Sequence, residues 1–239
     1  MLTNATAPSQ YKTIAIIVAG GSGSRMQSAL PKQFLLLNGR PVILHTIDAF
    51  LVSGHQPEIV LVLPEAYHSY WHELCLQYHF NHPHRLVSGG QTRFHSVKNA
   101  LDILDTLDDD ALIAVHDAVR PLTSAGIIDA GYEQAAEQGN AITAVKSRDS
   151  VRRVQHNRSE SLLREEIYLV QTPQTFTLQQ LQRAYALPYT EAFTDDASVV
   201  EQAGYTIHLA EGSYQNFKIT YPEDIAIAEL LLSKKGPAV

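Results

Sequence analysis

The sequence predicts an α/β fold in which a mostly parallel sheet is covered by helices on both faces. Short apolar runs rich in Ile and Val alternate with stretches of helical periodicity along nearly the whole chain, which is the order that strand–helix–strand units require. The first run, Ile14–Val18, is apolar without interruption, as expected of a parallel strand buried on both faces.

The elements follow in order along the chain. The expected strands are six short apolar runs: Thr13–Ala19, Glu58–Leu63, Arg85–Val87, Ala111–His116, Ala141–Val145 and Thr206–Leu209. The expected helices are the amphipathic stretches between and after them: Pro41–Phe50, Ala66–His79, Thr92–Leu107, Ser124–Gln138, Asp195–Ala203 and Pro222–Ser233. Right-handed crossovers between such strands would give a Rossmann-like sheet.

The segment 147–170 departs from this pattern because it is charged and irregular. Its alternation, as at Val151 and Arg153, predicts a β-hairpin that has little core of its own. Since an isolated two-stranded hairpin is marginally stable, we expect a protruding β-arm that contacts a second copy of the chain. A plain surface loop is the alternative. No linker divides the sequence, so residues 1–239 are expected to form a single domain.

Composition excludes several classes of function. The net charge is −7, which argues against broad electrostatic binding to nucleic acid or to an anionic membrane. Cys75 is the single cysteine, so neither an intramolecular disulfide nor a thiolate metal cluster is expected. No apolar run approaches the length of a spanning helix, and the first ten residues lack a signal-peptide core. We therefore expect a cytoplasmic protein.

A glycine-rich turn follows the first strand directly. Gly20, Gly21 and Gly23 come immediately after Ala19, and the cations Arg25 and Lys32 follow. Bare backbone amides and cations at the end of a strand suit a polyphosphate. Neither the dinucleotide fingerprint nor the P-loop pattern fits this turn. A tight turn with no ligand is the alternative.

A second glycine turn, Gly89-Gly90, precedes an expected helix. Its backbone could contact the edge of a base, and the hydroxyl of Ser96 lies one turn into the helix. Taken alone, the motif is better explained by ordinary capping of that helix by Thr92.

Polar residues also follow the fourth strand and occur near the C-terminus. Asp117 and Arg120 end that strand, where open α/β sheets bind ligands; a salt bridge between them that shapes the turn is the alternative. Thr194 begins a helix-capping sequence. Lys218 lies among apolar residues on an expected short strand, Asn216–Thr220, which favours a role in binding over a solvated charge.

Together these motifs resemble the 2-C-methyl-D-erythritol 4-phosphate cytidylyltransferase family. The resemblance extends in order from about residue 13 to 232, and its motifs are these: Ala19–Met26 with Pro31–Gln33, Gly89-Gly90, Val115–Pro121, Gln171–Gln174, Thr194–Ser198 and Asn216–Thr220. It implies transfer of CMP from CTP to 2-C-methyl-D-erythritol 4-phosphate, with release of pyrophosphate. The alternatives are the sister ribitol-5-phosphate cytidylyltransferase and a non-catalytic nucleotide-binding module.

The resemblance also implies roles for individual residues. Three basic residues would be catalytic: Arg25, Lys32 and Lys218. Binding of CTP would fall to Ala19, Gly20, Gly21, Gly23, Gly90, Ser96 and Asp117. Binding of the phosphorylated sugar alcohol would fall to Asp117, Arg120, Ser150, Arg164, Thr172, Thr194 and Lys218. Ser150 and Arg164 would reach the site of the partner in a homodimer. Mg²⁺ would be held mainly by the phosphates of CTP, with no protein residue assigned as its ligand.

Overall fold

The computed structural model describes residues 11–20 and 30–234. Its centre is a seven-stranded sheet in the order β11-β7-β10-β6-β1-β4-β5. The strands of this sheet are β1 (Thr13–Val18), β4 (Glu58–Leu63), β5 (His84–Ser88), β6 (Leu112–Asp117), β7 (Asn140–Lys146), β10 (Tyr168–Thr177) and β11 (Leu209–Glu211). Neighbouring strands are parallel except at β10, which pairs antiparallel with both β6 and β7. The predicted mostly parallel sheet is confirmed.

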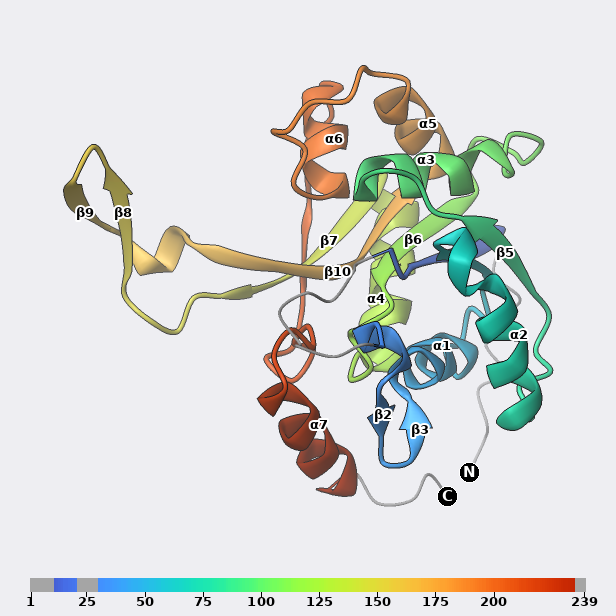
Figure 1. Cartoon of the computed structure of the whole chain (residues 1–239). Helices are drawn as coiled ribbons and strands as arrows, with labels where there is room; N and C mark the ends of the chain where they lie inside the picture. The colour runs from blue at the N-terminus through green and yellow to red at the C-terminus, as the bar shows by residue number, and fades with distance from the viewer. Residues whose placement is uncertain (1–10, 21–29, 235–239) are drawn as a thin grey trace, which may run out of the picture.

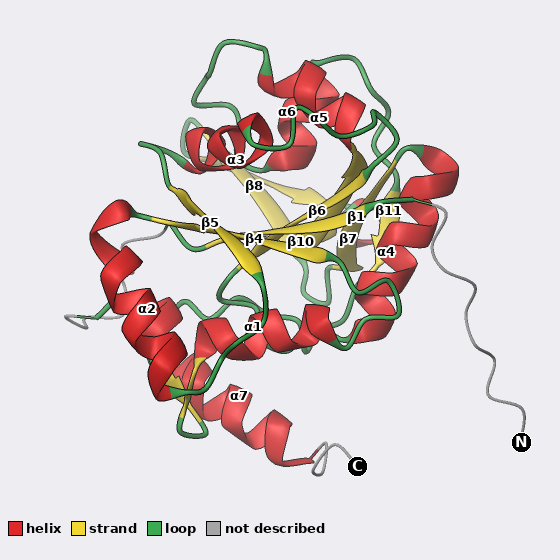
Figure 2. Cartoon of the chain, turned by 90° about the vertical axis from the view of Figure 1, so that its right-hand side faces the viewer, coloured by secondary structure: helices red, strands yellow, loops and turns green. Residues whose placement is uncertain are grey.

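Helices cover both faces of the sheet (Figure 2). One face carries α3 (Arg93–Asp102), α5 (Leu178–Tyr185) and α6 (Asp196–Gln202), and the other carries α1 (Val42–Leu51), α2 (His68–Gln77) and α4 (Ala125–Gln138). Alternate residues of β1 supply the two apolar cores, Ile14 and Ile16 on one face and Ala15 and Ile17 on the other. Burial on both faces is why this strand reads as an unbroken apolar run.

A third apolar cluster holds the C-terminal helix α7 (Glu223–Lys234) against the small hairpin of β2 (Leu36–Leu37) and β3 (Arg40–Pro41). Ile219 is fully buried in this cluster beside Leu37 and Val119. The cluster anchors the segment Asn216–Thr220, which the sequence led us to expect as a strand. That expectation is wrong, because the segment is irregular. It is fixed by packing and by hydrogen bonds, among them the backbone bond from the Ile219 amide to the Val119 carbonyl (2.9 Å).

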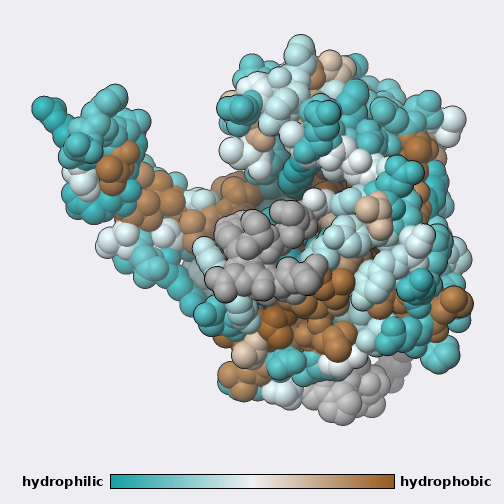
Figure 3. Space-filling view, in the orientation of Figure 1, coloured by the Kyte–Doolittle hydropathy of each residue, from teal (hydrophilic) through white to brown (hydrophobic). Residues whose placement is uncertain are grey.

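A hairpin of β8 (Val151–Gln155) and β9 (Arg158–Leu162) projects from the body of the molecule (Figure 1). It lies within the predicted arm, and the chain returns from it through β10 into the central sheet. Apolar side chains are exposed on the arm and its neck, as the brown atoms there show (Figure 3). Among them are Val154, Leu163 and Leu169, which are 69%, 66% and 51% exposed.

Several expected boundaries move in the structure. The helix expected over Thr92–Leu107 ends at Asp102, and the strand expected over Thr206–Leu209 begins only at Leu209. At the start of the last helix, the Asp224 carboxylate accepts from the amides of Thr220 and Tyr221 (2.7 and 2.8 Å). No helix among residues 11–20 and 30–234 is long and apolar enough to cross a membrane.

Candidate active site

The order in which successive strands join the sheet reverses between β1 and β6. From β1 the chain adds β4 and β5 on one side, and then returns to add β6 on the other. Ligands of open α/β sheets bind at such a switch point, beyond the carboxyl ends of the strands. Val18 and Asp117 are register partners there, and the Ala118 amide donates to the Val18 carbonyl (3.0 Å). The first glycine turn and the motif at Asp117 therefore leave the sheet side by side.

Three cations surround the Asp117 carboxylate. Lys218 Nζ lies 3.0 Å away, Arg120 Nε 3.4 Å and Arg93 Nε 3.7 Å. Burial opposes ionisation of this carboxyl, but Lys218, Arg93 and Arg120 outweigh it and hold its pKa well below the ordinary value. Asp117 is therefore a fixed anion, and the salt bridge to Arg120 exists alongside two further ion pairs.

Asp117 lies in a pocket of about 200 Å³. The pocket is lined by Arg93, Asp117, Arg120, Val170, Gln171, Thr172, Gln174, Thr194, Asp195 and Lys218. It thus brings together five of the residues that the sequence suggested for the sugar-alcohol phosphate: Asp117, Arg120, Thr172, Thr194 and Lys218.

Hydrogen bonds fix the walls of this pocket. The Asp117 amide donates to Thr172 Oγ1 (3.0 Å), and Arg120 Nη1 donates to the carbonyl of Asn216 (2.7 Å). Asn216 Nδ2 in turn donates to the carbonyl of Thr172 (2.8 Å). Strand ends from β6 and β10 and the C-terminal segment are therefore held as one polar unit, with Lys218 on its rim at 39% side-chain exposure.

Lys32 approaches the same C-terminal segment from the other side. It begins a short 3-10 turn, Lys32–Phe34, is 7% exposed, and donates from Nζ to the carbonyl of Ile219 (2.9 Å). The next residue, Gln33, donates from Nε2 to the carbonyl of Ala19 (2.8 Å). Lys32 and Gln33 are thus hydrogen-bonded to Ile219, the residue that follows Lys218, and to Ala19 at the end of β1.

Gly20 and the second glycine turn lie close together at the Ser96 hydroxyl. Ser96 Oγ accepts from the Gly90 amide and donates to the Thr92 carbonyl (both 3.0 Å). A methyl group on Gly20 would lie 3.5 Å from this oxygen. Ala19, Gly20, Gly90 and Ser96 are therefore neighbours, as a shared binding role requires. Thr92 also caps α3 by accepting from the His95 amide, so the capping interpretation holds at the same time.

Other predicted residues do not join the pocket. Gly21, Gly23 and Arg25 lie outside the described residues. Ser150 and Arg164 are exposed on the arm, where Arg164 donates to the carbonyl of Arg148 and pairs with Glu165. Neither lines the pocket. In a single chain, Ser150 and Arg164 are separate from the pocket, although Val170 at the end of the predicted arm lines it.

The sequence reasoning assigned no role to five pocket residues: Arg93, Val170, Gln171, Gln174 and Asp195. Arg93 had a detectable signal, because a cation at the first position of a helix is disfavoured by the helix dipole and calls for a reason. Gln174 had none, since its role depends on its bond to Asp195 (2.9 Å) and on the Ala197 amide that donates to it (2.9 Å).

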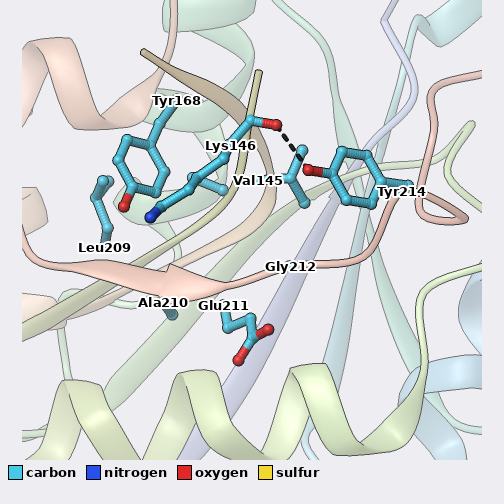
Figure 4. Close-up of a pocket in the computed structure, with 9 residues that line it drawn as sticks. Val145, Lys146, Tyr168, Leu209, Ala210, Glu211, Gly212 and Tyr214 are labelled. Carbon is cyan, nitrogen blue, oxygen red and sulfur yellow. Dashed lines mark hydrogen bonds between the residues drawn. The ribbon is translucent and has the colours of Figure 1, made fainter. Parts of the chain in front are cut away.

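A second cavity, of about 400 Å³, lies at the base of the arm (Figure 4). The side chains of Lys146 and Tyr168 point toward each other there, and the Tyr214 hydroxyl donates to the Lys146 carbonyl (2.8 Å). Its lining shares no residue with the pocket around Asp117.

Chemically, the site is suited to phosphates. Cationic groups and bare amides lie at the ends of parallel strands, and the described residues include no group of three His, Cys, Asp or Glu side chains that could hold a metal ion. The buried histidine of the motif, His116, is neutral, because burial lowers its pKa to about 3. A general base is therefore not evident, whereas binding sites for anions are.

Comparison with known proteins points to one family. Residues 13–234 match the family model described as IspD, 2-C-methyl-D-erythritol 4-phosphate cytidylyltransferase. Curated proteins of that name from Bacteroides thetaiotaomicron and Porphyromonas gingivalis are 45% and 46% identical, covering 92% and 94% of this chain and 100% and 99% of their own length. The crystal structure of the enzyme of that name from Francisella tularensis superimposes with a TM-score of 0.75 at 32% identity, over 92% of this chain and 99% of its own.

Proposed function

This chain belongs to the 2-C-methyl-D-erythritol 4-phosphate cytidylyltransferase family, and we propose that it performs the family reaction in the pocket around Asp117. It transfers CMP from CTP to 2-C-methyl-D-erythritol 4-phosphate and releases pyrophosphate, a step of isoprenoid biosynthesis. The observation that carries the assignment of this site is that Gly20 at the end of β1, the second glycine turn, Lys32 and the Asp117–Lys218 pair lie together at the switch point of the sheet.

CTP binds along the glycine turns in this proposal. The amides near Ala19, Gly20 and Gly90 contact the base, and Ser96 Oγ, which already bonds the Gly90 amide, fixes that turn. Lys32 binds the triphosphate, together with Arg25 and the amides of Gly21 and Gly23, whose roles rest on the sequence motif. Support comes from Gln33, whose bond to the Ala19 carbonyl holds Lys32 at the end of β1.

The sugar-alcohol phosphate binds in the pocket. Arg120 and Lys218 are the cations on its walls that can pair with the acceptor phosphate. The Asp117 carboxylate can accept hydrogen bonds from the alcohol groups, and the hydroxyls of Thr172 and Thr194 can accept or donate. Because Lys218 contacts Asp117 and adjoins Ile219, to which Lys32 donates, the two substrate phosphates would meet between the two lysines.

The chemistry needs positioning more than proton transfer. An oxygen of the acceptor phosphate attacks the α-phosphorus, the bond from that phosphorus to the bridging oxygen of the β-phosphate breaks, and pyrophosphate leaves. The acceptor is already an anion, because the second pKa of a phosphate monoester is about 6. Lys32, Lys218 and Arg25 would stabilise the charge that builds up in the transition state. Because the acceptor needs no deprotonation, the neutral His116 has no acid–base role.

Mg²⁺ fits the site as a companion of CTP. Asp117 and Asp195 are the described carboxylates on the pocket wall, and Mg²⁺ often binds to one or two carboxylates plus substrate phosphates. Asp117 is the candidate protein ligand, with the phosphates of CTP supplying the other contacts. The ion would neutralise charge on the leaving pyrophosphate.

We propose further that the arm forms a homodimer. Its exposed apolar side chains, Val154, Leu163 and Leu169, are suited to contact with a second copy. In such a dimer, Ser150 and Arg164 on the arm reach the pocket of the partner subunit. This accounts for their distance from the pocket of their own chain. A cytoplasmic location and the absence of nucleic-acid binding remain expectations from the sequence.

The test is an assay of pyrophosphate release with CTP and Mg²⁺, offering 2-C-methyl-D-erythritol 4-phosphate and ribitol 5-phosphate in parallel. The methylerythritol phosphate is expected to be the better acceptor by kcat/KM. Faster release with ribitol phosphate would identify the sister activity instead. CTP binding by calorimetry without any turnover would indicate a nucleotide-binding module.

A further inference from the structure

We propose that Arg93 is a positioning residue that ties the nucleotide-binding turn to the acceptor pocket. The nucleotide-binding turn is residues 89–96, and the acceptor loop is residues 194–198. This inference rests on the proposed function and deepens it, because it assigns a residue that links the sites of the two substrates.

Arg93 contacts both sides at once. It is the first residue of α3, directly after the glycine turn and its cap, Thr92. Its Nη1 and Nη2 donate to the two carboxylate oxygens of Asp196 (2.7 and 2.6 Å), and its Nε lies 3.7 Å from Asp117. Asp196 is the first residue of α6 and is fully buried. One guanidinium therefore joins the starts of two helices and the end of β6.

This placement runs against local preference. A cation at a helix N-terminus is disfavoured by the helix dipole, and burial alone would lower the pKa of Arg93. Asp196 and Asp117 reverse that effect and raise the pKa above its ordinary value. A forked, planar group can bond one carboxylate with two parallel hydrogen bonds while its Nε faces another, which a lysine cannot do.

Aromatic packing already holds the region of α3 to that of α6, so joining these helices does not by itself explain why an arginine stands at position 93. Phe94 stacks on Tyr185 (4.6 Å between ring centroids) and on Phe193 (5.6 Å), which joins α3 to the helix α5 and to the acceptor loop. Arg93 adds what these rings cannot, namely a charge facing Oδ1 of Asp117 and two hydrogen bonds that hold the first turn of α6. Both of these groups face the pocket or flank it.

The consequence concerns alignment. Gly90 and Ser96 lie within one turn of Arg93 on the nucleotide side, and Thr194 and Asp195 lie within two residues of Asp196 on the acceptor side. A displacement of reacting groups by about 1 Å can cost about a hundredfold in rate. Loss of the Arg93 fork should therefore weaken the binding of both CTP and the acceptor, although Arg93 lines only the acceptor pocket.

The test compares Arg93→Gln, Arg93→Lys and Asp196→Asn with the control Tyr185→Phe. Tyr185 donates to the same Asp196 carboxylate (2.6 Å) but does not line the pocket, so its variant probes the buried cluster without the fork. For each protein we would measure the melting temperature, kcat, both KM values, and the CTP dissociation constant by calorimetry with Mg²⁺.

Arg93→Gln and Asp196→Asn are expected to lower kcat/KM by at least about a hundredfold, with both KM values raised and CTP bound at least about tenfold more weakly. Arg93→Lys should resemble them, because it keeps the charge and loses the fork. Tyr185→Phe should lower the melting temperature while each KM stays within about twofold of that of the wild type.

Three results would overturn the proposal: Arg93 variants that match Tyr185→Phe, a lysine variant that matches the wild type, or a change confined to the acceptor KM with CTP binding intact. If Arg93→Gln fails to fold, Asp196→Asn and Arg93→Lys decide by the same criteria. A wild-type protein that binds CTP but releases no pyrophosphate would refute the proposed function alone, since the calorimetric comparison would still test the link.

Discussion

Gly90 offers a test of how closely the nucleotide-binding turn packs on the helix behind it. A Cβ atom at Gly90 would lie 2.4 Å from His95 Cβ and 2.9 Å from the His95 carbonyl carbon. Ordinary contacts begin near 3.4 Å, so Gly90→Ala would have to move the turn by about 1 Å (3.4 − 2.4). The obstacle includes backbone of α3, which cannot rotate away as a flexible side chain can.

Two effects are expected from this shift. Overpacking of this kind costs about 1–3 kcal/mol of folding stability. A displacement of about 1 Å in the groups that position a substrate costs about a hundredfold in kcat/KM. We therefore expect Gly90→Ala to lower the melting temperature and to lower kcat/KM for CTP by about a hundredfold, mainly through a higher KM for CTP.

The neighbouring glycine supplies a matched control. A Cβ at Gly89 would meet Ser96 Oγ at 3.4 Å and backbone of Leu63 and Pro64 at 3.6 Å, at or just beyond the edge of ordinary contact. Gly89→Ala should therefore change stability by no more than about 0.5 kcal/mol. The assays are thermal unfolding and pyrophosphate release at varied CTP. If Gly90→Ala kept the stability and the CTP KM of Gly89→Ala, the close approach of this turn to α3 would have no functional weight.

Three further outcomes are expected. Lys32→Ala should lower kcat by at least about a hundredfold, the scale of losing one preorganised donor; near-normal turnover in steady-state assays would remove Lys32 from the mechanism. Arg164→Glu should raise the acceptor KM or lower kcat by about tenfold or more in protein verified as a dimer by light scattering, and unchanged kinetics there would refute the shared site. The pKa of His116 in the folded protein is about 3, below the ordinary 6.5, so the neutral imidazole contributes its full stabilisation of the fold above pH 6.5 and loses it as the pH falls toward 3. Between pH 7 and 5 the free energy of unfolding of the wild type should therefore fall by about 2 kcal/mol more than that of His116→Gln. Urea-unfolding measurements that show the same pH dependence for both proteins would contradict this.

The sequence allowed the parallel part of the sheet to be predicted because those strands are buried on both faces. Strands β1, β4 and β6 each contain an unbroken apolar run of four or five residues, and Asp117 ends β6 as the glycine turn follows β1. The rule that ligands bind at strand ends then predicted Asp117 and Arg120 as binding residues, and both line the pocket described above. Lys218 could be predicted as a binding residue for a related reason, since a cation among buried neighbours needs a partner.

Strand β10 could not be predicted in the same way. Its middle, Gln171–Gln174, contains a proline and three polar residues and resembles a turn, although it lies in the centre of the sheet. The pairing with β7 shifts register between Val170 and Gln174, which accommodates Pro173, a residue with no amide to donate. The polar side chains are satisfied by distant partners, as when Gln171 donates to the Ser213 carbonyl (2.9 Å). Such partners are known only after folding.

The course of β10 gives the arm a direct connection to the site. This strand begins in the arm at Tyr168, first lines the pocket at Val170, and then presents Thr172, whose hydroxyl accepts a hydrogen bond from the Asp117 amide. A second connection runs through Arg148, whose guanidinium lies 3.4 Å from the centroid of the Tyr214 ring. Tyr214 precedes the segment that carries Lys218. A partner subunit that held the arm would therefore restrict both the strand beside Asp117 and the segment that presents Lys218, so dimerisation should affect the order of a subunit's own pocket as well as completing its partner's.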